Sequence, residues 1–467
     1  MEFRLLGWMI LGLFVVFMGC SGGGDADPEP AGDSGEETSS DAGVDTAADM
    51  AVDMAVDTAA DLDEVLAPSV CTGTPLVREL SVDADETFDL GPYLMYVTRD
   101  SAVVMWRTLD SVDGRVWYRK PADRPQAEAT HEGDTTVHEV LLEGLAEDTE
   151  YTYHVESGGV TSEEHVFRTA PPLGSPIRFA GWADNQSGWE TFTEQVPLLI
   201  DDGPQFVIGV GDLVNNGKNE PDWKQQLFGP ARALLHQVPL FAAIGNHEGN
   251  AHFWYDLMSY PYPEGDAQHE SYYTYTWGNT FFLIFDPYKL PCAFGDIETP
   301  HSEWLKEVAA SEEAQAATWR IVYAHEPAES ECWGDGSCTY HGNPCVREGV
   351  LPLLAEHGFH VYFSGHTHAW ERGIVEGMIH MIIGGGGGSL DAWCWDLPQT
   401  SVVFNDHHHI RVDAGCETLR IEGVDMAGEV FDWVEIAPTS PVTIVDEGPA
   451  DWLPPPTVNS DSPGEGS

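Results

Sequence analysis

The sequence predicts an α/β domain that is preceded by an all-β sandwich. Over residues 173–436, apolar β-rich runs end in Gly, Asp, Asn or His and alternate with helical stretches. Over residues 69–172, short alternating runs are separated by polar turns, and no helical periodicity appears. The chain has 467 residues, of which 42% are hydrophobic, so it can build more than one core.

The first 19 residues have the pattern of an export signal. Arg4 precedes the apolar run Leu5–Met18, which is shorter than the ~20 residues that a membrane-spanning helix needs. Gly19 and Cys20 follow at once and resemble the lipobox of bacterial lipoproteins, which implies that Cys20 is lipidated. We expect an exported lipoprotein at the outer membrane or cell surface, with a secreted or periplasmic protein as the alternative.

Two segments have a composition that is typical of disordered chains. Residues 21–68 carry 14 acidic and no basic residues and no apolar stripe, so residues 20–68 are predicted to be an acidic linker behind the lipid-anchored Cys20. Residues 437–467 are rich in Pro, Ser and Gly and are predicted to be a disordered tail.

The charge and the cysteines restrict the partners and the compartment. With 78 acidic against 20 basic residues, the formal charge of −58 repels polyanions, and we expect no nucleic-acid partner. In an exported protein most cysteines pair, so up to three disulfides with one cysteine left over are expected, and their pairing is open. Besides Cys20, the cysteines are Cys71, Cys292, Cys332, Cys338, Cys345, Cys394 and Cys416.

The β-sandwich is predicted from five strand-like runs. They are Leu94–Arg107, Arg115–Arg119, Val137–Leu142, Tyr151–Glu156 and His165–Thr169. Tyr151 lies in a spacing that resembles the tyrosine corner of fibronectin type III domains. Nothing in this region has a catalytic composition, so we interpret it as a spacer that packs beside the next domain.

The α/β domain is predicted from seven apolar runs, each followed by polar residues. The runs are Ile177–Trp182, Phe206–Val210, Leu240–Ile244, Thr280–Phe285, Arg320–Tyr323, His360–Phe363 and Met378–Ile383. In α/β sheets ligands bind beyond the carboxyl ends of the strands, so these polar residues are expected to share one rim.

Five polar segments on that rim carry the chemistry. They are Asp184–Gln186, Gly211–Asn216, Gly245–Glu248, His325 and Gly365–His368. Asp, Asn and neutral His supply the mixed oxygen and nitrogen ligands that suit Zn, Fe or Mn. Two carboxylates with three imidazoles exceed what one metal ion needs from a protein, so two divalent metal ions are expected.

The order of these segments resembles the calcineurin-like metallophosphoesterases, and the preceding sandwich makes the purple acid phosphatases the nearest branch. The resemblance covers about residues 73–436 and implies layered β-sheets flanked by helices. It also implies that Asp212 bridges the two metal ions and that His247 contacts the phosphate group. The remaining ligands that it implies are Asp184 and His368 at the first metal ion, and Asn246, His325 and His366 at the second.

Two positions depart from the family pattern. Asn215 stands where purple enzymes carry a Tyr, so no purple colour and divalent metals are expected. Gln186 stands where many relatives outside the purple branch carry a His, so the first site is expected to bind metal weakly. Whether Gln186 and Asn215 bind metal or only support the ligands is left open.

Three other features are interpreted as structural. Arg372 lies beside Glu371 in the pattern of an ion pair, Gly384–Gly388 lacks the Lys-Ser/Thr ending of a P-loop, and His407–His409 fit a polar strand end.

These observations favour an enzyme that hydrolyses phosphate esters, with phosphomonoesters preferred. Asp212 and His247 are the predicted catalytic residues, and hydroxide activated by the metals is the expected nucleophile. A phosphodiesterase is the nearest alternative, because the same metals serve both reactions. The alternative of another class is a catalytically degenerate surface-binding lipoprotein, which Gln186 and Asn215 favour.

Overall fold

The computed structural model describes residues 71–121, 127–130, 133–261, 270–290, 299–334 and 336–449. All of these described residues belong to one compact unit. The predicted signal over residues 1–19, the lipidation site Cys20, the acidic linker to residue 68 and Cys292 lie outside the described residues.

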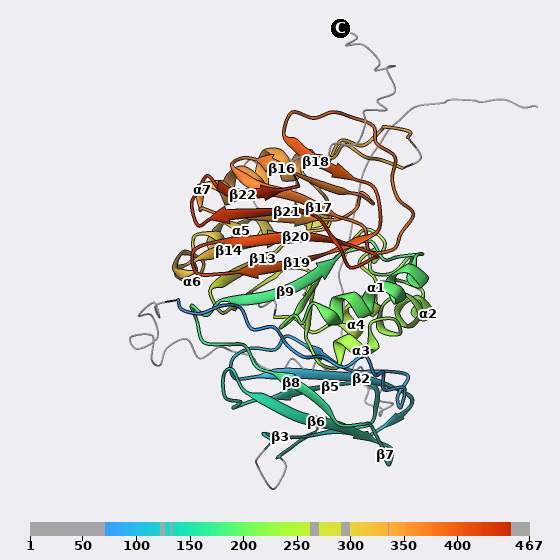
Figure 1. Ribbon diagram of the computed structural model, residues 1–467. Helices are drawn as coiled ribbons and strands as arrows, with labels where there is room; N and C mark the ends of the chain where they lie inside the picture. Colours follow the sequence, from blue (N-terminus) through green and yellow to red (C-terminus); the bar gives the residue numbers. More distant parts are fainter. Residues whose placement is uncertain are drawn as a thin grey trace, which may run out of the picture. The chain divides into compact units, whose positions relative to one another are not determined.

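The largest sheet joins strands from both ends of the described chain (Figure 1). Its order is β22 (Thr443–Gly448), β21 (Val430–Ala437), β20 (Leu419–Asp425), β19 (His408–Ala414), β9 (Ile177–Trp182), β10 (Val207–Val210), β11 (Leu240–Ala243), β1 (Leu90–Met95), β2 (Ala102–Val112) and β5 (Thr135–Leu142). β9, β10 and β11 are parallel, and β19 runs antiparallel to β9. We call it the ten-stranded sheet.

A seven-stranded sheet faces the ten-stranded sheet. Its order is β12 (Tyr273–Trp277), β13 (Thr280–Ile284), β14 (Trp319–Tyr323), β15 (Val361–Ser364), β17 (Met378–Ile383), β16 (Trp370–Val375) and β18 (Thr400–Phe404). Aromatic rings fill the space between the sheets: the centroid of Phe282 lies 5.4 Å from that of Phe179 and 5.5 Å from that of Phe206. All three side chains are buried, so one shared apolar core holds the two sheets together.

Short helices occupy the connections between strands. They are α1 (Trp189–Asp201), α2 (Glu220–Asp222), η1 (Trp223–Phe228), α3 (Arg232–Leu235), α4 (His252–Leu257), η2 (Pro287–Lys289), α5 (Pro300–Ala309), α6 (Glu312–Ala316), η3 (Val346–Val350) and α7 (Leu351–Glu356). All seven runs predicted for the α/β domain coincide with strands, within one residue at either end, so this pattern is confirmed. In the described part of the chain, every helix is too short or too polar to cross a membrane.

The N-terminal β region forms a smaller sheet and also extends the ten-stranded one. The smaller sheet has the order β4 (Ala127–Thr130), β3 (Gly114–Arg119), β6 (Glu150–Ser157) and β7 (Val160–Thr161), and β8 (His165–Arg168) pairs with β6. β1, however, pairs in parallel with β11, with Met95 opposite Leu240. The region predicted to pack beside the next domain therefore shares a sheet with it.

Buried polar contacts reinforce this junction. The guanidinium group of Arg232 on α3 donates to the main-chain oxygens of Asp85, Phe88, Asp89 and Gly91. The buried arginine therefore satisfies four main-chain carbonyl groups and fixes the chain at the start of β1.

The run predicted as one strand over Leu94–Arg107 is two strands. β1 ends at Met95, and β2 begins at Ala102. The hydroxyl oxygen of Thr98 accepts hydrogen bonds from the main-chain N–H groups of Asp100 and Ser101, which closes a tight turn between them.

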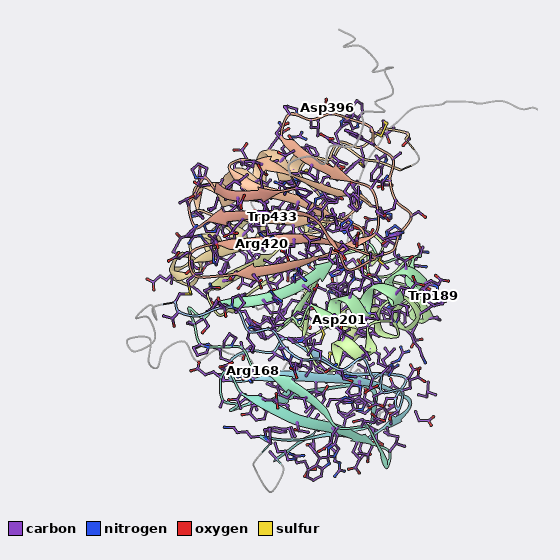
Figure 2. All side chains as sticks on the ribbon, in the orientation of Figure 1. Arg168, Trp189, Asp201, Asp396, Arg420 and Trp433 are labelled. Atoms are coloured by element: carbon purple, nitrogen blue, oxygen red, sulfur yellow. A yellow bond between two sulfur atoms is a disulfide. The ribbon has the colours of Figure 1, made fainter. Side chains whose placement is uncertain are left out.

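The prediction of a disordered tail from residue 437 is wrong for residues 443–448. This segment forms β22, which pairs with β21 at the edge of the ten-stranded sheet. Ile444 packs against the core, and Glu447 forms an ion pair with Arg372 at 2.7 Å. On the neighbouring strands β20 and β21, Arg420 makes a cation–π contact with Trp433, 3.9 Å from the ring centroid (Figure 2).

Disulfides tie distant loops together. Cys71 pairs with Cys416 and thus joins the start of the described chain to the β19–β20 connection. Cys338 pairs with Cys394, Cys345 is also disulfide-bonded, and Cys332 is a buried free thiol. The expectation that most cysteines pair is confirmed for the described residues.

Candidate metal centre

The predicted ligands meet where strand ends of the two sheets face each other. Asp184, Asp212 and Asn246 follow β9, β10 and β11 of the ten-stranded sheet. His325 follows β14 of the seven-stranded sheet, and His366 and His368 follow β15. The rule that parallel strands present ligands at their carboxyl ends therefore applies to both sheets at once.

Asp212 lies at the centre of this group. Its Oδ2 atom is 3.1 Å from His325 Nε2, and its Oδ1 atom accepts the main-chain N–H of His247 at 2.8 Å. Ligand atoms of Asp212, His325 and His366 all lie within 4.8 Å of one another. The main chain therefore holds Asp212 Oδ1, and Asp212 Oδ2 is the oxygen that faces His325.

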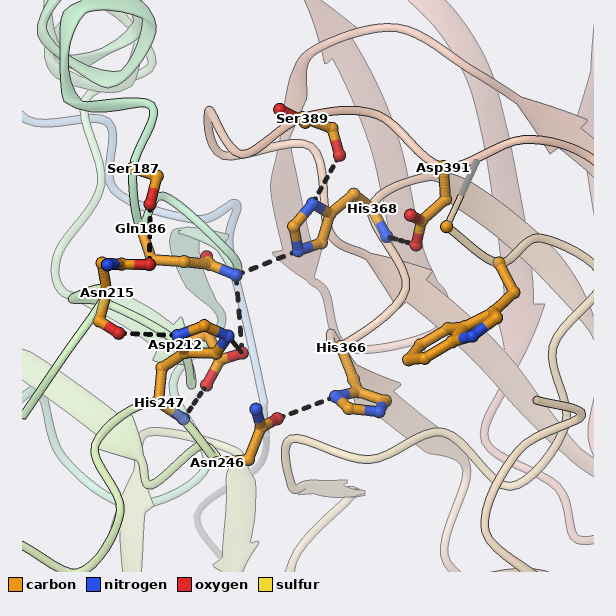
Figure 3. A pocket seen from close by; sticks show the side chains of 12 residues that line it. Gln186, Ser187, Asp212, Asn215, Asn246, His247, His366, His368, Ser389 and Asp391 are labelled. Atoms are coloured by element: carbon orange, nitrogen blue, oxygen red, sulfur yellow. Dashed lines mark hydrogen bonds and ion pairs between the residues drawn. The ribbon is translucent and has the colours of Figure 1, made fainter. Parts of the chain in front are cut away.

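Asn246, His325 and His366 form one cluster of donor atoms. Asn246 Oδ1 lies 2.8 Å from His366 Nδ1 and 3.2 Å from His325 Nε2 (Figure 3 shows the first contact). Donor atoms around one tetrahedral metal ion lie roughly 3.3–3.5 Å apart when each is ~2.0–2.1 Å from the ion. The spacing and chemistry of these atoms fit the second metal ion.

Asp184, His368 and Gln186 form the other cluster. His368 Nε2 lies 3.6 Å from Asp184 Oδ1. The Gln186 amide is assigned with its nitrogen toward the main-chain oxygens of Asp184 and Asp212, which leaves its oxygen 3.0 Å from His368 Nε2. Gln186 therefore presents an oxygen donor beside the first metal position.

Main-chain oxygens set the orientation of two imidazoles. His325 Nδ1 lies 2.9 Å from the oxygen of Val210, and His368 Nδ1 lies 2.6 Å from the oxygen of Ser389. Because a carbonyl oxygen only accepts, each Nδ1 carries a proton, and in the neutral ring each Nε2 has a free lone pair. Both rings thus turn a metal-binding nitrogen toward the centre.

The backbone around the centre is strained where the ligands sit. Asp184, Asp212 and His366 have φ values of 62°, 52° and 69°, in the left-handed region that non-glycine residues seldom occupy. Neighbouring glycines allow the close approach: a Cβ atom at Gly245 would lie 2.2 Å from Asp212 Oδ1, and one at Gly365 would lie 2.4 Å from Asp184 Oδ2. Any side chain at either glycine would displace a carboxylate.

The metal-free electrostatics of the group are unbalanced. Burial raises the pKa of Asp184 well above its usual range. Burial also opposes ionisation of Asp212, but the charges of His325 and His247 outweigh it and lower the pKa of Asp212. Burial alone would lower the pKa of His325, yet Asp212 and Asp184 raise it to about 10. The ionised forms of Asp184 and Asp212 therefore need positive charge nearby to be stable, and bound divalent cations would supply it.

A cavity of about 320 Å³ opens above the donor atoms (Figure 3). His247 stands at one end, where its Nδ1 atom lies 2.7 Å from the main-chain oxygen of Asn215. The side-chain oxygen of Asn215 accepts a hydrogen bond from Ser187 Oγ at 2.8 Å. Asn215 thus supports His247 and Ser187 at the rim, and its amide is engaged away from the donor cluster.

Three features interpreted as structural have structural contacts. The ion pair of Arg372 is not with Glu371, as predicted, but with the buried Asp432, in a bidentate contact at 2.8 and 3.0 Å. His409 bonds to Asp202 at 2.8 Å. The glycine run packs under the first ligand loop, where the N–H of Gly388 donates to the oxygen of Asp184 at 2.8 Å.

The sequence analysis missed several residues that line the cavity. They are Ser187, Gly334, Ser389 and Asp391. Ser389 and Asp391 follow β17 as the predicted ligands follow their strands, but the glycine run between them and the strand resembles a turn. Trp333 also lines the cavity, although an aromatic residue in the sequence is more often part of a core than of a pocket wall.

Comparisons with known proteins agree with this arrangement. Residues 177–370 match the calcineurin-like phosphoesterase family, and residues 91–169 match the purple acid phosphatase N-terminal domain. Purple acid phosphatase 15 of Arabidopsis thaliana is 26% identical over 293 residues, which cover 54% of this chain and 53% of that protein. Purple acid phosphatase 23 of the same plant is 24% identical over 364 residues, which cover 64% of this chain and 77% of that protein.

The chain spans about half the length of the first of these relatives. Among solved structures, a purple acid phosphatase from yellow lupin seeds superimposes with a TM-score of 0.65 at 19% identity and covers 74% of each chain. The predicted fold class is thus confirmed as a metallophosphatase fold with an N-terminal sheet domain. The chain is therefore similar to the calcineurin-like phosphoesterases over residues 177–370 and to the purple acid phosphatase N-terminal domain over residues 91–169.

Proposed function

We propose that this protein is a metal-dependent phosphatase that hydrolyses phosphate esters and prefers phosphomonoesters. One observation carries the proposal. Asp212, His325 and His366 bring their ligand atoms within 4.8 Å of one another, and Asp212 and His366 line the same cavity as His247. The remaining predicted ligands surround these three, which is the donor set of a two-metal centre.

The residues divide the work of holding the metals. Asp184 and His368, with the Gln186 oxygen beside them, would hold one ion, and Asn246, His325 and His366 would hold the other. Asp212 would be shared by the two ions. When bound, two divalent ions would lower the pKa of a water molecule and balance the charge of the phosphate group. The side chains that line the cavity would bind and orient the ester.

His247 is placed to act on the substrate directly. Since its Nδ1 atom donates to the Asn215 oxygen, its Nε2 atom is the one that is turned into the cavity, 3.8 Å from Asp212 Oδ2. The imidazole is about one-third exposed at 35%, so a phosphate oxygen can reach it. His247 would hydrogen-bond the phosphate group and supply a proton to the leaving oxygen.

The test combines metal content with turnover. Residues 69–467 would be purified and analysed for metals by mass spectrometry, and hydrolysis of p-nitrophenyl phosphate would be followed before and after chelation. Two metal ions per chain and turnover that chelator abolishes would support the proposal. Inert protein after addition of Mn, Fe or Zn would contradict it and favour the surface-binding lipoprotein instead.

A phosphodiesterase is the second candidate, and one observation favours it. A further cavity of about 380 Å³ shares Asn246 with the metal cavity and extends toward Tyr288 and Lys289. It offers room for a second ester group. Faster hydrolysis of bis-p-nitrophenyl phosphate than of p-nitrophenyl phosphate would select the diester function.

We also propose that the N-terminal sheets are fibronectin type III-like. The Tyr151 hydroxyl accepts the main-chain N–H of Ala146 at 2.9 Å, which is the contact of a tyrosine corner.

With Asn215 in the place of a Tyr, the purified protein would lack the visible absorption band of a phenolate bound to ferric iron.

Export and anchoring belong to the same proposal. Cys20 follows the apolar run Leu5–Met18 and would carry the lipid of an outer-membrane or surface lipoprotein. Expression of the full chain in a Gram-negative host with labelled palmitate tests it. Label that is lost in Cys20→Ser would support lipidation, whereas unlabelled soluble protein would indicate an ordinary secretory signal.

A further inference from the structure

Asp391 is a carboxylate in the metal cavity that the proposed hydrolysis does not use. It lines the cavity, and its Oδ2 atom accepts the main-chain N–H of His368 at 2.9 Å. In Figure 3 it lies on the far side of His368 from His247. Its Oδ1 atom has no hydrogen-bond partner among the described residues, and no lysine or arginine is found in the cavity lining.

The wall that carries Asp391 is built from two loops that are locked together. The N–H of Trp333 donates to the oxygen of Ala392 at 2.9 Å, and the N–H of Ala392 donates to the oxygen of Gly334 at 2.8 Å. Further along the same two loops, the disulfide between Cys338 and Cys394 joins them again. Asp391 is therefore held in place beside Trp333.

The buried carboxylate of Glu371 anchors the first of these loops. It accepts the main-chain N–H groups of Glu331 at 2.8 Å and Cys332 at 3.0 Å, directly before Trp333. Glu371 lies on β16 of the seven-stranded sheet, so the wall is fixed to the sheet that supplies the imidazole ligands.

Trp333 gives this wall an aromatic face. Its ring lies 5.1 Å from the ring of His366 and 4.6 Å from the ring of Tyr340, measured between centroids. Trp333 is half-buried, so part of its indole faces the cavity. An aromatic face next to a fixed carboxylate is the combination that binds ammonium groups, through cation–π attraction and an ion pair.

The charge of Asp391 is unfavourable for a purely anionic substrate. Its negative charge is among those that raise the pKa of Asp184, after burial and Asp212, so the charge reaches the metal centre. A carboxylate that no protein cation balances would weaken the binding of a phosphate ester. An ester whose leaving group carries a positive charge converts this repulsion into attraction.

We propose that Asp391 and Trp333 form a subsite for an alkylammonium group on the leaving group of the substrate. The substrate class is then the phosphate monoesters of amino alcohols, with either a primary or a quaternary ammonium group. This inference rests on the proposed phosphatase function and assigns its specificity. His247 and the metal ligands act on the phosphate end, and Asp391 and Trp333 act on the other end.

The first test compares a charged with a neutral leaving group of similar size. For the metal-loaded protein we expect kcat/KM to be roughly tenfold higher for phosphoethanolamine than for propyl phosphate. Asp391→Asn should remove most of this preference. An asparagine oxygen can still accept the His368 N–H, so the variant removes the charge and keeps the contact. Trp333→Leu should weaken the preference in part.

The second test measures binding without turnover. Calorimetry with aminoethylphosphonate and propylphosphonate, neither of which has an ester bond, should show the same tenfold preference and the same loss in Asp391→Asn. Asp110→Asn, an exposed change on β2 outside the cavity, is the matched control and should keep the preference.

The two proposals fail in different ways. If the protein hydrolyses p-nitrophenyl phosphate but has equal kcat/KM for phosphoethanolamine and propyl phosphate, the ammonium subsite alone is overturned. A preference that survives Asp391→Asn would overturn it as well. Absence of any hydrolysis together with absence of phosphonate binding would overturn the phosphatase. Charge-selective phosphonate binding without hydrolysis would keep the subsite and convert the protein into a binding protein.

Discussion

The two sheets contribute opposite kinds of candidate ligand to the proposed metal centre. The ten-stranded sheet supplies oxygen donors, which are Asp184, Gln186, Asp212 and Asn246. The seven-stranded sheet supplies nitrogen donors, which are His325, His366 and His368. The oxygen side therefore carries the negative charge, whereas the imidazole side is neutral when its nitrogens are free to bind metal.

The two sides are also held by different means. Main-chain N–H groups fix the carboxylates, as when His366 donates to both Asp184 oxygens at 2.9 and 3.0 Å. Main-chain oxygens fix the imidazoles, as at His325 and His368. Each sheet thus presents one half of the centre. Mutation can therefore change the charge of the carboxylate side and the orientation of the imidazole side separately.

The largest expected effect comes from the charge on the oxygen side. Asp212→Asn removes the bridging charge while an amide oxygen can still accept the His247 N–H. We expect kcat to fall more than about a thousandfold and metal content to drop, with the melting temperature of the metal-free protein preserved. Normal turnover in this variant would rule out a two-metal mechanism.

A second change breaks the ion pair that joins the two sheets without touching the metal centre. Arg372 on β16 and Asp432 on β21 join the seven- and ten-stranded sheets and are 4% and 1% exposed. Asp432→Ala removes the buried partner of this guanidinium group and leaves it only Glu447, whose side chain is 47% exposed, so denaturant titration should show a loss of about 3–5 kcal/mol. Metal content should be unchanged. Glu164→Ala, in an exposed pair with Arg119, should cost less than about 1 kcal/mol.

A buried histidine of the seven-stranded sheet should make the stability of the fold depend on pH. Burial lowers the pKa of His380 on β17 to about 4, and its Nε2 atom accepts the N–H of Ala328 at 3.2 Å. Because the unfolded chain binds the proton more tightly, with a pKa of ~6.5, the stability contributed by neutral His380 is complete above that value. It is lost as the pH falls toward 4.

His380→Gln tests this dependence. Between about pH 7 and pH 5 the wild-type protein should lose about 2 kcal/mol more of its unfolding free energy than the variant does, measured by urea titration of metal-free protein. The exposed His252→Gln should leave the pH dependence unchanged. An identical pH dependence in wild type and His380→Gln would contradict the assignment.

The smallest expected effect comes from moving a nitrogen donor to the oxygen side. Gln186→His replaces an amide oxygen beside His368 by an imidazole, so the first metal ion should bind roughly tenfold more tightly. Gln186→Leu removes the donor and should have the opposite effect. Metal titration followed by calorimetry distinguishes these outcomes, and equal affinities would show that Gln186 does not contact metal.

The sequence could predict the grouping of the candidate site because the rule of strand ends is local. Each ligand follows an apolar run that can be recognised without its neighbours, and the structure brings all of them together. Asp391 was missed because the five glycines before it resemble a turn, and only the packing of the Trp333 loop places it in the cavity.

Long-range pairings were beyond the sequence for a physical reason. Cys71 and Cys416 are separated by 345 residues, and seven cysteines permit many pairings. The alternation in β22 is only six residues long, so the Pro- and Ser-rich composition around it dominated the interpretation. The Cys71–Cys416 disulfide and the pairing of β22 both depend on which parts of the fold lie next to these segments in space.

The pairing of β1 with β11 has a consequence for how the molecule can be divided. The chain changes character near residue 172, yet the ten-stranded sheet continues across that boundary. Removing the N-terminal region would uncover β11 as a new edge strand, with its hydrogen-bonding groups open to self-association. The phosphoesterase region and its N-terminal region should therefore melt in one cooperative transition, and a truncated protein that begins after residue 172 should aggregate.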